Sequence, residues 1–396
     1  MTKNSLKNGP DELGYYGEGE SAMGGMAVGE TLMPALHELN LAFEDAIKDK
    51  AFLDEFAYYC KHYIGRPSPL YYAENLSNKL GGAKILFKQE HLNHTGSHKI
   101  TNSLFQVLLA KRMGKKNLIC ESGAGQHYSA TAAVAAKFGI PLIGVMGEVD
   151  IKRVNQNIIK AKHYGAKLKA VPGTLKEAIT DAIKTWITNP DYYYVCGSAV
   201  SSFPFPKIVQ FAQSVIGREI REQCLEQEKK LPNMIIGCVG GGSNFIGSIH
   251  EFLDETSIKK IGVEAAETAA LTHGTPNIMQ GMKSYMLASS DGSKSLGGSS
   301  LGAGIQYFGV GPQHSYLKDQ GAVTYTSATD KEILNAYKVV AQSEGISSAL
   351  EPMAAAAEVL KQAKGKPKDF IIVLSLCGRG EKDLDTIEEH MGKDFE

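Results

Sequence analysis

Short apolar runs alternate with segments of helical period along most of this 396-residue chain. The runs are rich in Val, Ile and Leu, which is typical of parallel strands that helices cover on both faces. The candidate strands are 84–88, 117–120, 142–146, 167–171, 192–196, 234–239, 260–264 and 370–376. The candidate helices are 103–112, 129–138, 154–164, 174–188, 211–229 and 330–343. This alternation predicts an α/β fold with mostly parallel, twisted sheets.

The size and charge of the chain limit its organisation and its partners. A chain of 396 residues with 43% hydrophobic content is too long for one core, so we expect roughly two domains. A formal net charge of −1 gives no reason to expect nucleic acid or an anionic membrane as a partner. We find neither a signal-peptide pattern nor an apolar run of ~20 residues, and we therefore expect a cytoplasmic protein.

One apolar run, 234–239, leads directly into a glycine-rich turn. The turn consists of Gly240, Gly241, Gly242, Ser243 and Asn244. Backbone N–H groups in such a turn can surround a phosphate, although an isolated match could also be only a tight connection between a strand and a helix.

Lys99 lies in the polar segment 93–102. Alone, it would most often be a solvated surface lysine. Together with a phosphate-binding turn it suggests a covalently held cofactor, because a lysine amine forms a Schiff base with an aldehyde. Pyridoxal phosphate supplies both the aldehyde and the phosphate, and its ring acts as an electron sink.

Two further strand ends carry polar groups. Glu121 follows strand 117–120, where a carboxylate can point into a cleft and act as a general acid or base. The glycine-rich segment after it leads into helix 129–138 and could hold a carboxylate on its N–H groups, or could simply cap the helix. Cys377 follows strand 370–376 and could reach a cofactor or be an inert core thiol. The six cysteines lack metal-ligand spacing and are expected to be reduced.

Several segments resemble, in order and spacing, the motifs of the tryptophan synthase β subunit family. They are 93–102, 121–127, 213–217, 240–244, 262–266, 309–314, 344–346 and 378–380. The resemblance covers about 14–385 and implies a fold-type II pyridoxal-phosphate enzyme, with two three-layer α/β domains and the cofactor between them. The implied domains are 1–60 plus 90–215, which includes a mobile subdomain at about 114–198, and 61–89 plus 216–396.

The resemblance also assigns roles to the motifs. It implies synthesis of L-tryptophan from indole and L-serine by β-replacement, through an aminoacrylate that a closed, dry site protects from water. Lys99 would bind the cofactor covalently and remove the Cα proton, and Glu121 would protonate the leaving hydroxyl and assist deprotonation at the indole nitrogen. Further cofactor contacts would come from His98, Gly240, Gly241, Gly242, Ser243, Asn244, Glu351 and Cys377. Substrate contacts would come from Ser122, Gly123, Ala124, Gly125, Gln126, His127 and Gln306.

Several positions depart from the family pattern, and three of them motivate an alternative function. Gln306 stands where the family usually has an aspartate that contacts the serine hydroxyl, Cys377 replaces a serine opposite the pyridine nitrogen, and Tyr128 stands where a small glycine is usual. These departures keep open a divergent enzyme that performs β-replacement or β-elimination with another amino acid or another nucleophile. A catalytically silent paralogue is a third alternative, which the retention of Lys99 and Glu121 opposes.

Partners are implied by the same resemblance. We expect an amino acid and an indole-like nucleophile as substrates, a homodimer, and neither nucleic acid nor a membrane. An α subunit that delivers indole through a tunnel is left open, since segment 267–274 is slightly shorter than usual. No metal site is predicted, although a monovalent cation near Gly240, Tyr307 and Gly309 is left open.

Overall fold

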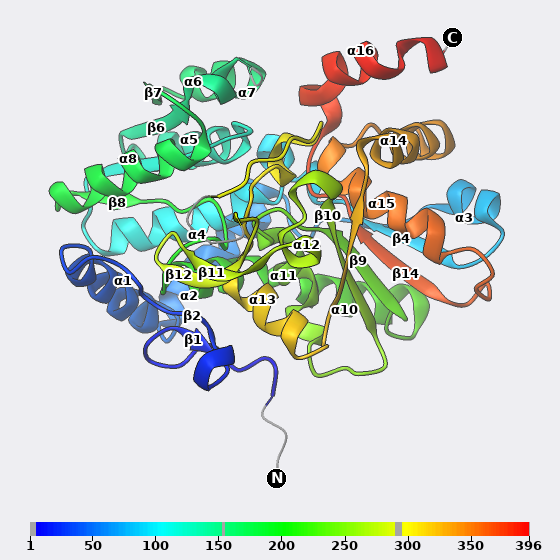
Figure 1. Cartoon of the computed structure of the whole chain (residues 1–396), viewed down its shortest axis with the longest axis horizontal. Helices are drawn as coiled ribbons and strands as arrows, with labels where there is room; N and C mark the ends of the chain where they lie inside the picture. Colours follow the sequence, from blue (N-terminus) through cyan, green and yellow to red (C-terminus); the bar gives the residue numbers. More distant parts are fainter. Residues whose placement is uncertain (1–4, 153–154, 290–294, 396) are drawn as a thin grey trace.

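The structure is a computed structural model that describes residues 5–152, 155–289 and 295–395. Its strands form a larger, mostly parallel sheet, a smaller parallel sheet and a small antiparallel sheet, with helices packed around them (Figure 1). In Figure 1 the smaller parallel sheet lies to the left and the larger one to the right. The predicted α/β class with mostly parallel sheets is confirmed.

The larger sheet has six strands in the order β13-β10-β9-β14-β4-β3. They are β3 (Leu70–Tyr72), β4 (Lys84–Lys88), β9 (Met234–Cys238), β10 (Lys259–Ala265), β13 (Thr324–Ala328) and β14 (Ile371–Ser375). All neighbouring pairs are parallel except β3 with β4. Every residue of β9 and β14 is buried, as expected for central strands covered on both faces. Because β9 and β14 are parallel neighbours, their carboxyl ends open on the same edge.

The smaller parallel sheet has four strands in the order β7-β6-β5-β8. They are β5 (Asn117–Glu121), β6 (Leu142–Gly147), β7 (Lys167–Val171) and β8 (Tyr192–Tyr194). The whole sheet falls within the segment 114–198. With β4, β9, β10 and β14, these strands confirm the eight predicted ones, each end lying within two residues of its predicted position.

The antiparallel sheet was not predicted, nor were β3 and β13. It has the order β1-β2-β12-β11 and consists of β1 (Tyr15–Tyr16), β2 (Met23–Gly24), β11 (Thr275–Met279) and β12 (Met282–Met286). The two-residue strands β1 and β2 are too short to leave an apolar run in the sequence. Gln280 and Gly281 join β11 to β12 with φ values of 46° and 76°, the positive values that a tight hairpin turn requires at both central positions.

The helices surround the sheets. They are α1 (Met33–Ala46), α2 (Lys50–Tyr59), α3 (Glu74–Leu80), α4 (Lys99–Arg112), α5 (Gln126–Phe138), α6 (Glu148–Ile151), α7 (Asn155–His163), α8 (Leu175–Thr188), α9 (Phe205–Gln213), α10 (Val215–Glu228), α11 (Ser243–Ile249), α12 (Ala270–His273), α13 (Pro312–Asp319), α14 (Asp330–Glu344), α15 (Leu350–Gln362) and α16 (Leu384–Phe395). The predicted helices correspond to α4, α5, α7, α8, α10 and α14. Residue 154, which the prediction included in α7, lies outside the described residues.

One helix prediction was wrong. The expected continuous helix 211–229 is divided at Ser214 into α9 and α10. The Ser214 hydroxyl donates a hydrogen bond to the carbonyl of Gln210 at 2.7 Å, and a serine side chain bonded in this way bends a helix.

Apolar side chains pack on both faces of the larger sheet. Ile236 and Val263 belong to the core on one face, and Ile235 and Val373 to the core on the other. None of the described helices combines the length and the apolar character needed to cross a membrane. The described residues also contain no group of three or more His, Cys, Asp or Glu side chains arranged to hold a metal ion.

Candidate active site

A cavity of about 310 Å³ lies where strand ends of the two parallel sheets meet. It is lined by Glu121 at the end of β5, Cys238 at the end of β9 and Cys377 just after β14. Its volume falls in the ~300–1,000 Å³ range of small-molecule sites. Of the residues that the sequence analysis assigned to the site, Gly125 and Gly309 do not line the cavity and the others do.

Lys99 begins α4 and faces the cavity. Its Nζ donates a hydrogen bond to the carbonyl of Gly197. Burial lowers the pKa of Lys99, although the nearby Glu121 carboxylate raises it. A lysine that gives up its proton more readily is a better nucleophile and a better base.

Glu121 ends β5 and is 5% exposed. Its Oε1 accepts a hydrogen bond from the Gly197 N–H at 3.1 Å, and its Oε2 is buried without a hydrogen-bond partner among the described residues. Burial raises the pKa of Glu121, while Tyr194, the Gly197 N–H and Lys99 lower it. A carboxyl group with a raised pKa can carry a proton closer to neutral pH and donate it as a general acid.

Two buried amides hold the residue before Gly197. Gln106 Nε2 donates to the Cys196 carbonyl at 2.7 Å, and Gln106 Oε1 accepts from the Cys196 N–H at 3.0 Å. Asn102 Nδ2 donates to the same carbonyl at 2.8 Å, and its Oδ1 accepts from Gln106 Nε2 at 2.8 Å. We call Asn102, Gln106 and Cys196 the amide clamp. Because Gly197 contacts both Lys99 and Glu121, the clamp fixes the residue that joins them.

The sequence analysis missed the amide clamp, although a signal was present. Asn102 and Gln106 follow Lys99 by three and seven residues, so all of them lie on one face of α4. Two amides on the face of a buried helix need partners. Gly197 itself could not have been singled out; a Cβ on it would lie 2.4 Å from the His127 ring, which only the fold reveals.

The glycine-rich turn after β9 has no room for side chains. A Cβ on Gly240 would lie 2.4 Å from the carbonyl oxygen of Gly304, and one on Gly241 would overlap a neighbouring serine hydroxyl. Gly242 has a φ of 92°, and a Cβ there would lie 2.2 Å from the ring of His314. The turn therefore lies directly against the segments behind it, as the phosphate-binding prediction requires of its glycines.

His98, Ser243 and Asn244 surround this turn. His98 Nε2 lies 3.3 Å from the Ser243 hydroxyl, and His98 Nδ1 lies 3.1 Å from the Cys377 carbonyl. Asn244 Oδ1 accepts a hydrogen bond from Ser375 at 3.0 Å, whereas Asn244 Nδ2 is buried and finds no partner within the described residues. A buried donor of this kind can serve a phosphate oxygen.

His314 supports the turn from behind and was not predicted as a site residue. Its Nε2 lies 2.8 Å from the Gly242 carbonyl, and its Nδ1 lies 2.8 Å from the Tyr325 hydroxyl. Burial lowers the pKa of His314 to about 4, so the ring is neutral at neutral pH. Since a carbonyl only accepts, Nε2 carries the proton and Tyr325 donates to Nδ1.

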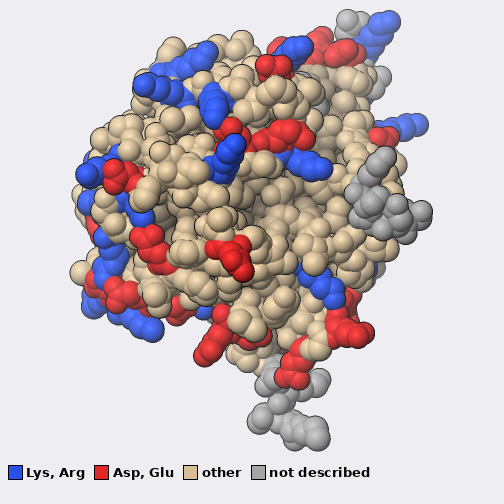
Figure 2. All heavy atoms as spheres, turned by 60° about the vertical axis from the view of Figure 1, so that its left-hand side comes forward, with Lys and Arg blue, Asp and Glu red and all other residues tan. Residues whose placement is uncertain are grey.

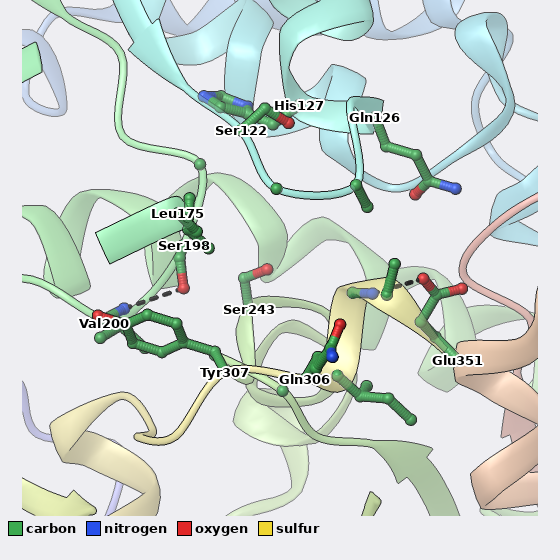
Figure 3. A pocket seen from close by; sticks show the side chains of 18 of the residues that line it. Ser122, Gln126, His127, Leu175, Ser198, Val200, Ser243, Gln306, Tyr307 and Glu351 are labelled. Carbon is green, nitrogen blue, oxygen red and sulfur yellow. Dashed lines mark hydrogen bonds between the residues drawn. The ribbon is translucent and has the colours of Figure 1, made fainter. Parts of the chain in front are cut away.

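The segment after Glu121 forms one wall of the cavity. Figure 3 shows Ser122, Gln126 and His127 on this side, across from Ser243, Gln306 and Tyr307. The Ser122 N–H already donates to the Val145 carbonyl at 3.1 Å, and His127 Nε2 lies 2.8 Å from the Val195 carbonyl. Burial lowers the pKa of His127 to about 3, so its ring is neutral. The free N–H groups in the first turn of α5, which begins at Gln126, remain able to hold a carboxylate.

Glu351 joins the Gln306 segment to the C-terminal part of the chain. Its Oε1 accepts from the Gly304 N–H at 2.7 Å and from Lys382 Nζ at 3.0 Å (Figure 3 shows the first contact). Its Oε2 is buried and unpartnered in the part of the chain that the structure describes. Burial raises the pKa of Glu351, but the charge and hydrogen bond of Lys382 lower it below its ordinary value.

Tyr128, one of the departures from the family pattern, does not line the cavity. Its side chain is fully buried in the core around the smaller sheet. A Cβ on Gly144 of β6 would lie 2.2 Å from the Tyr128 ring, so the ring fills space that this glycine leaves open. This departure alters the core rather than the lining of the cavity.

Another wall of the cavity is apolar and was not predicted. It includes Leu175, Ile179, Val200 and Phe308. These side chains come from α8, from the loop after β8 and from the loop before α13, and only Leu175 and Ile179, four residues apart on α8, are grouped by their spacing. An apolar wall opposite polar groups suits a substrate with one apolar part and one charged part.

The residues present fit the cofactor that the sequence predicts. The cavity combines an amine at Lys99 with a close-packed glycine turn and the unpartnered donor of Asn244. An aldehyde could bond to the amine, and a phosphate could lie against the turn.

Comparisons with known proteins agree with this chemistry. A family model described as "Pyridoxal-phosphate dependent enzyme" matches residues 62–378. The tryptophan synthase beta chain of Allorhizobium ampelinum is 48% identical over 401 residues, covering 98% of each chain. That of a Methylobacterium species is 46% identical over 404 residues, covering 99% of this chain and 98% of the relative. The chain therefore belongs to the tryptophan synthase beta chain family of pyridoxal-phosphate-dependent enzymes.

Proposed function

We propose that this chain makes L-tryptophan from indole and L-serine by a pyridoxal-phosphate-dependent β-replacement, as a carbon–oxygen lyase. One observation carries the proposal: Lys99 and Glu121 bind the carbonyl and the N–H of the same residue, Gly197, inside one cavity. A β-replacement needs a base at Cα and an acid at the leaving group, and these two side chains supply them. The full-length identity to proteins named tryptophan synthase beta chain supports the same substrates.

Lys99 and Glu121 divide the proton transfers. When bound, pyridoxal phosphate supplies an aldehyde for amino groups and a ring that withdraws electrons from Cα. Lys99, whose pKa burial lowers, holds the cofactor and takes the proton from Cα. Glu121, whose pKa burial raises, gives a proton to the departing hydroxyl of serine. Its carboxylate then accepts the proton of the indole N–H.

The remaining contacts hold the cofactor and the substrates. We assign the cofactor to His98, Lys99, Gly240, Gly241, Gly242, Ser243, Asn244, Glu351 and Cys377. We assign the amino-acid carboxylate to the segment from Ser122 to His127, chiefly to the N–H groups that start α5. The apolar wall that contains Leu175 and Ile179 receives indole and excludes water, which would otherwise divert the reaction.

Gln306 favours a second candidate, a related enzyme that uses a different β-substituted amino acid. An amide at this position keeps a hydrogen-bonding group but lacks the charge of the family's usual aspartate. A charge-assisted hydrogen bond to the serine hydroxyl would contribute ~1.5–3 kcal/mol.

The test compares the wild type with Gln306→Asp at saturating indole. Tryptophan synthesis predicts high kcat/KM for L-serine in the wild type and a nearly neutral substitution. A different donor predicts weak use of serine by the wild type and a gain of about tenfold or more in the variant. Undetectable tryptophan formation by wild-type protein that binds its cofactor normally would refute the leading proposal.

We also propose how the chain is organised. Its domains are 1–60 plus 90–215 and 61–89 plus 216–396, with a mobile subdomain at about 114–198 that closes over the substrates. The protein acts in the cytoplasm as a homodimer, with an α chain as the source of indole. Sedimentation of the pure protein, and the change in rate on adding a cognate α chain, test the two associations.

A further inference from the structure

Two thiols meet at the wall of the cavity. Cys238 Sγ and Cys377 Sγ lie 3.6 Å apart, and both residues line the cavity. Both are free thiols and both are buried, with exposed fractions of 5% and 6%. Small molecules that enter the cavity can therefore reach a pair of thiols that are otherwise buried.

The backbone brings the two residues within reach of a bond. The register of β9 with β14 places Ile236 opposite Leu374, and continued for two residues it places Cys238 opposite Leu376, the residue before Cys377. Neighbouring strands are ~4.8 Å apart, and a disulfide needs Cα atoms ~4.4–6.8 Å apart. The two sulfurs, which lie 3.6 Å apart, must approach by roughly 1.5 Å to reach the S–S bond length.

We propose that Cys238 and Cys377 form a dithiol modification site that peroxide oxidises to an intramolecular disulfide, and that bound pyridoxal phosphate protects. In the first step one thiol takes an oxygen atom from hydrogen peroxide, giving a sulfenic acid and one water. In the second, the other thiol attacks that sulfur, forming the S–S bond and releasing a second water. Peroxide is reduced, and the two thiols lose two hydrogen atoms and two electrons.

The surroundings of Cys377 explain both the stability of the thiol pair and its link to the cofactor. The hydrogen bond to Cys238 and burial raise the pKa of Cys377 well above its ordinary value, while His98 lowers it. Cys377 is therefore held as a thiol at neutral pH. His98 also contacts Ser243 of the glycine turn, so a ligand that fills this part of the cavity covers the route to the thiols.

The experiment treats the full-length chain with hydrogen peroxide, with and without saturating pyridoxal phosphate, and counts alkylatable thiols by mass spectrometry after denaturation. Without the cofactor we expect the count to fall from six to four, with a peptide that links Cys238 to Cys377, and dithiothreitol to restore it. The cofactor should slow this loss at least tenfold. The oxidised protein should bind pyridoxal phosphate at least tenfold more weakly.

Matched variants separate this site from general oxidation. Cys224→Ser removes a buried thiol of α10 that does not line the cavity, and it should still lose two thiols. Cys238→Ser should form no disulfide, and Cys377→Ser gives the same test if the first variant does not fold. Thiol loss in Cys238→Ser equal to that of the wild type, or a disulfide between other cysteines, would overturn the proposal.

Discussion

Two groups of buried charges in this molecule are built on opposite principles. The first, which we call the balanced cluster, contains Arg66, Lys88, Glu90 and Glu219. Arg66 pairs with Glu90 at 2.9 Å and with Glu219 at 2.8 Å, and Lys88 pairs with Glu219 at 2.6 Å. None of the side-chain oxygens or nitrogens found unpartnered within the described residues belongs to this cluster. Burial raises the pKa of Glu90, but Arg66 lowers it to about 2, so the carboxylate stays charged.

The second group is the pair of Lys99 and Glu121. Burial shifts both pKa values toward the neutral forms, and Glu121 Oε2 lacks a partner among the described residues. Removing one partner from a fully paired buried cluster is strongly destabilising, because it leaves an uncompensated buried charge. An incompletely paired one can exchange protons and accept a ligand. The contrast predicts that equivalent substitutions in the two groups will damage different properties.

The largest effect should come from Lys99→Ala. Removing the amine should abolish both the covalent link to the cofactor and turnover. The melting temperature should stay near that of the wild type, because the substitution removes a buried amine whose desolvation costs free energy. Borohydride reduction followed by mass spectrometry checks the link. A reduced cofactor still attached to the variant would mean that another lysine holds it.

Glu121→Gln should slow tryptophan formation by about 10²–10⁴-fold, the usual contribution of a positioned acid–base group. Cofactor binding and thermal stability should be unchanged, since a neutral isostere replaces a carboxyl group that burial already drives toward its neutral form. Steady-state kinetics and a thermal melt check both parts. Wild-type turnover in this variant would remove Glu121 from the mechanism.

Glu90→Gln should do the reverse. It leaves Arg66 with one carboxylate in place of two and should lower the free energy of unfolding by about 3–5 kcal/mol, with near-normal turnover per folded molecule. The pKa of Glu90 is depressed from 4.5 to about 2, so the folded state binds fewer protons than the unfolded state between these values. Wild-type stability should therefore fall as pH drops from about 4.5 toward 2, and the variant should lose the part of this fall that Glu90 contributes. Denaturant unfolding at several pH values measures this. If the free energy of unfolding changed equally with pH in the wild type and the variant, Glu90 would not be the source of the dependence.

Gln106→Met should have the smallest effect, a fall in kcat of about 10–100-fold with little change in KM for L-serine. The amide acts on the reacting groups only through Cys196 and Gly197, and small displacements of catalytic groups cost factors of this size. Gln210→Met, which removes an amide that donates to the Ser214 hydroxyl at the end of α9, is the control. Equal losses in the two variants would indicate general destabilisation rather than positioning.

The sequence predicted those parts of the molecule that leave a local pattern. Every predicted strand is present because buried parallel strands read as continuous apolar runs. Glu121 and the Gly240 turn could be placed at the cavity because each directly follows a strand, whereas Lys99 was linked to them only through the chemistry of the cofactor. The divided helix at Ser214 was missed because one hydroxyl bond, not the apolar period, breaks it.

The rest could not be predicted because it depends on segments distant in the sequence. Arg66 and Glu219 are paired across 153 residues, and His314 supports a turn 72 residues earlier. The apolar wall comes from one helix and two loops that are far apart in the sequence. The surface charge gives no further indication of the site, because positive and negative side chains are interspersed on the face that Figure 2 shows.

Gly197 gives the two proton-transfer groups a common mechanical support. Its carbonyl accepts a hydrogen bond from Lys99 and its N–H donates one to Glu121, the side chains that we propose as base and acid, so a displacement of this residue moves both. In a series of substitutions around Gly197, the rate of proton removal and the rate of hydroxyl departure should therefore rise and fall in parallel. Natural selection on the loop that carries Gly197 would then change the rates of both steps together.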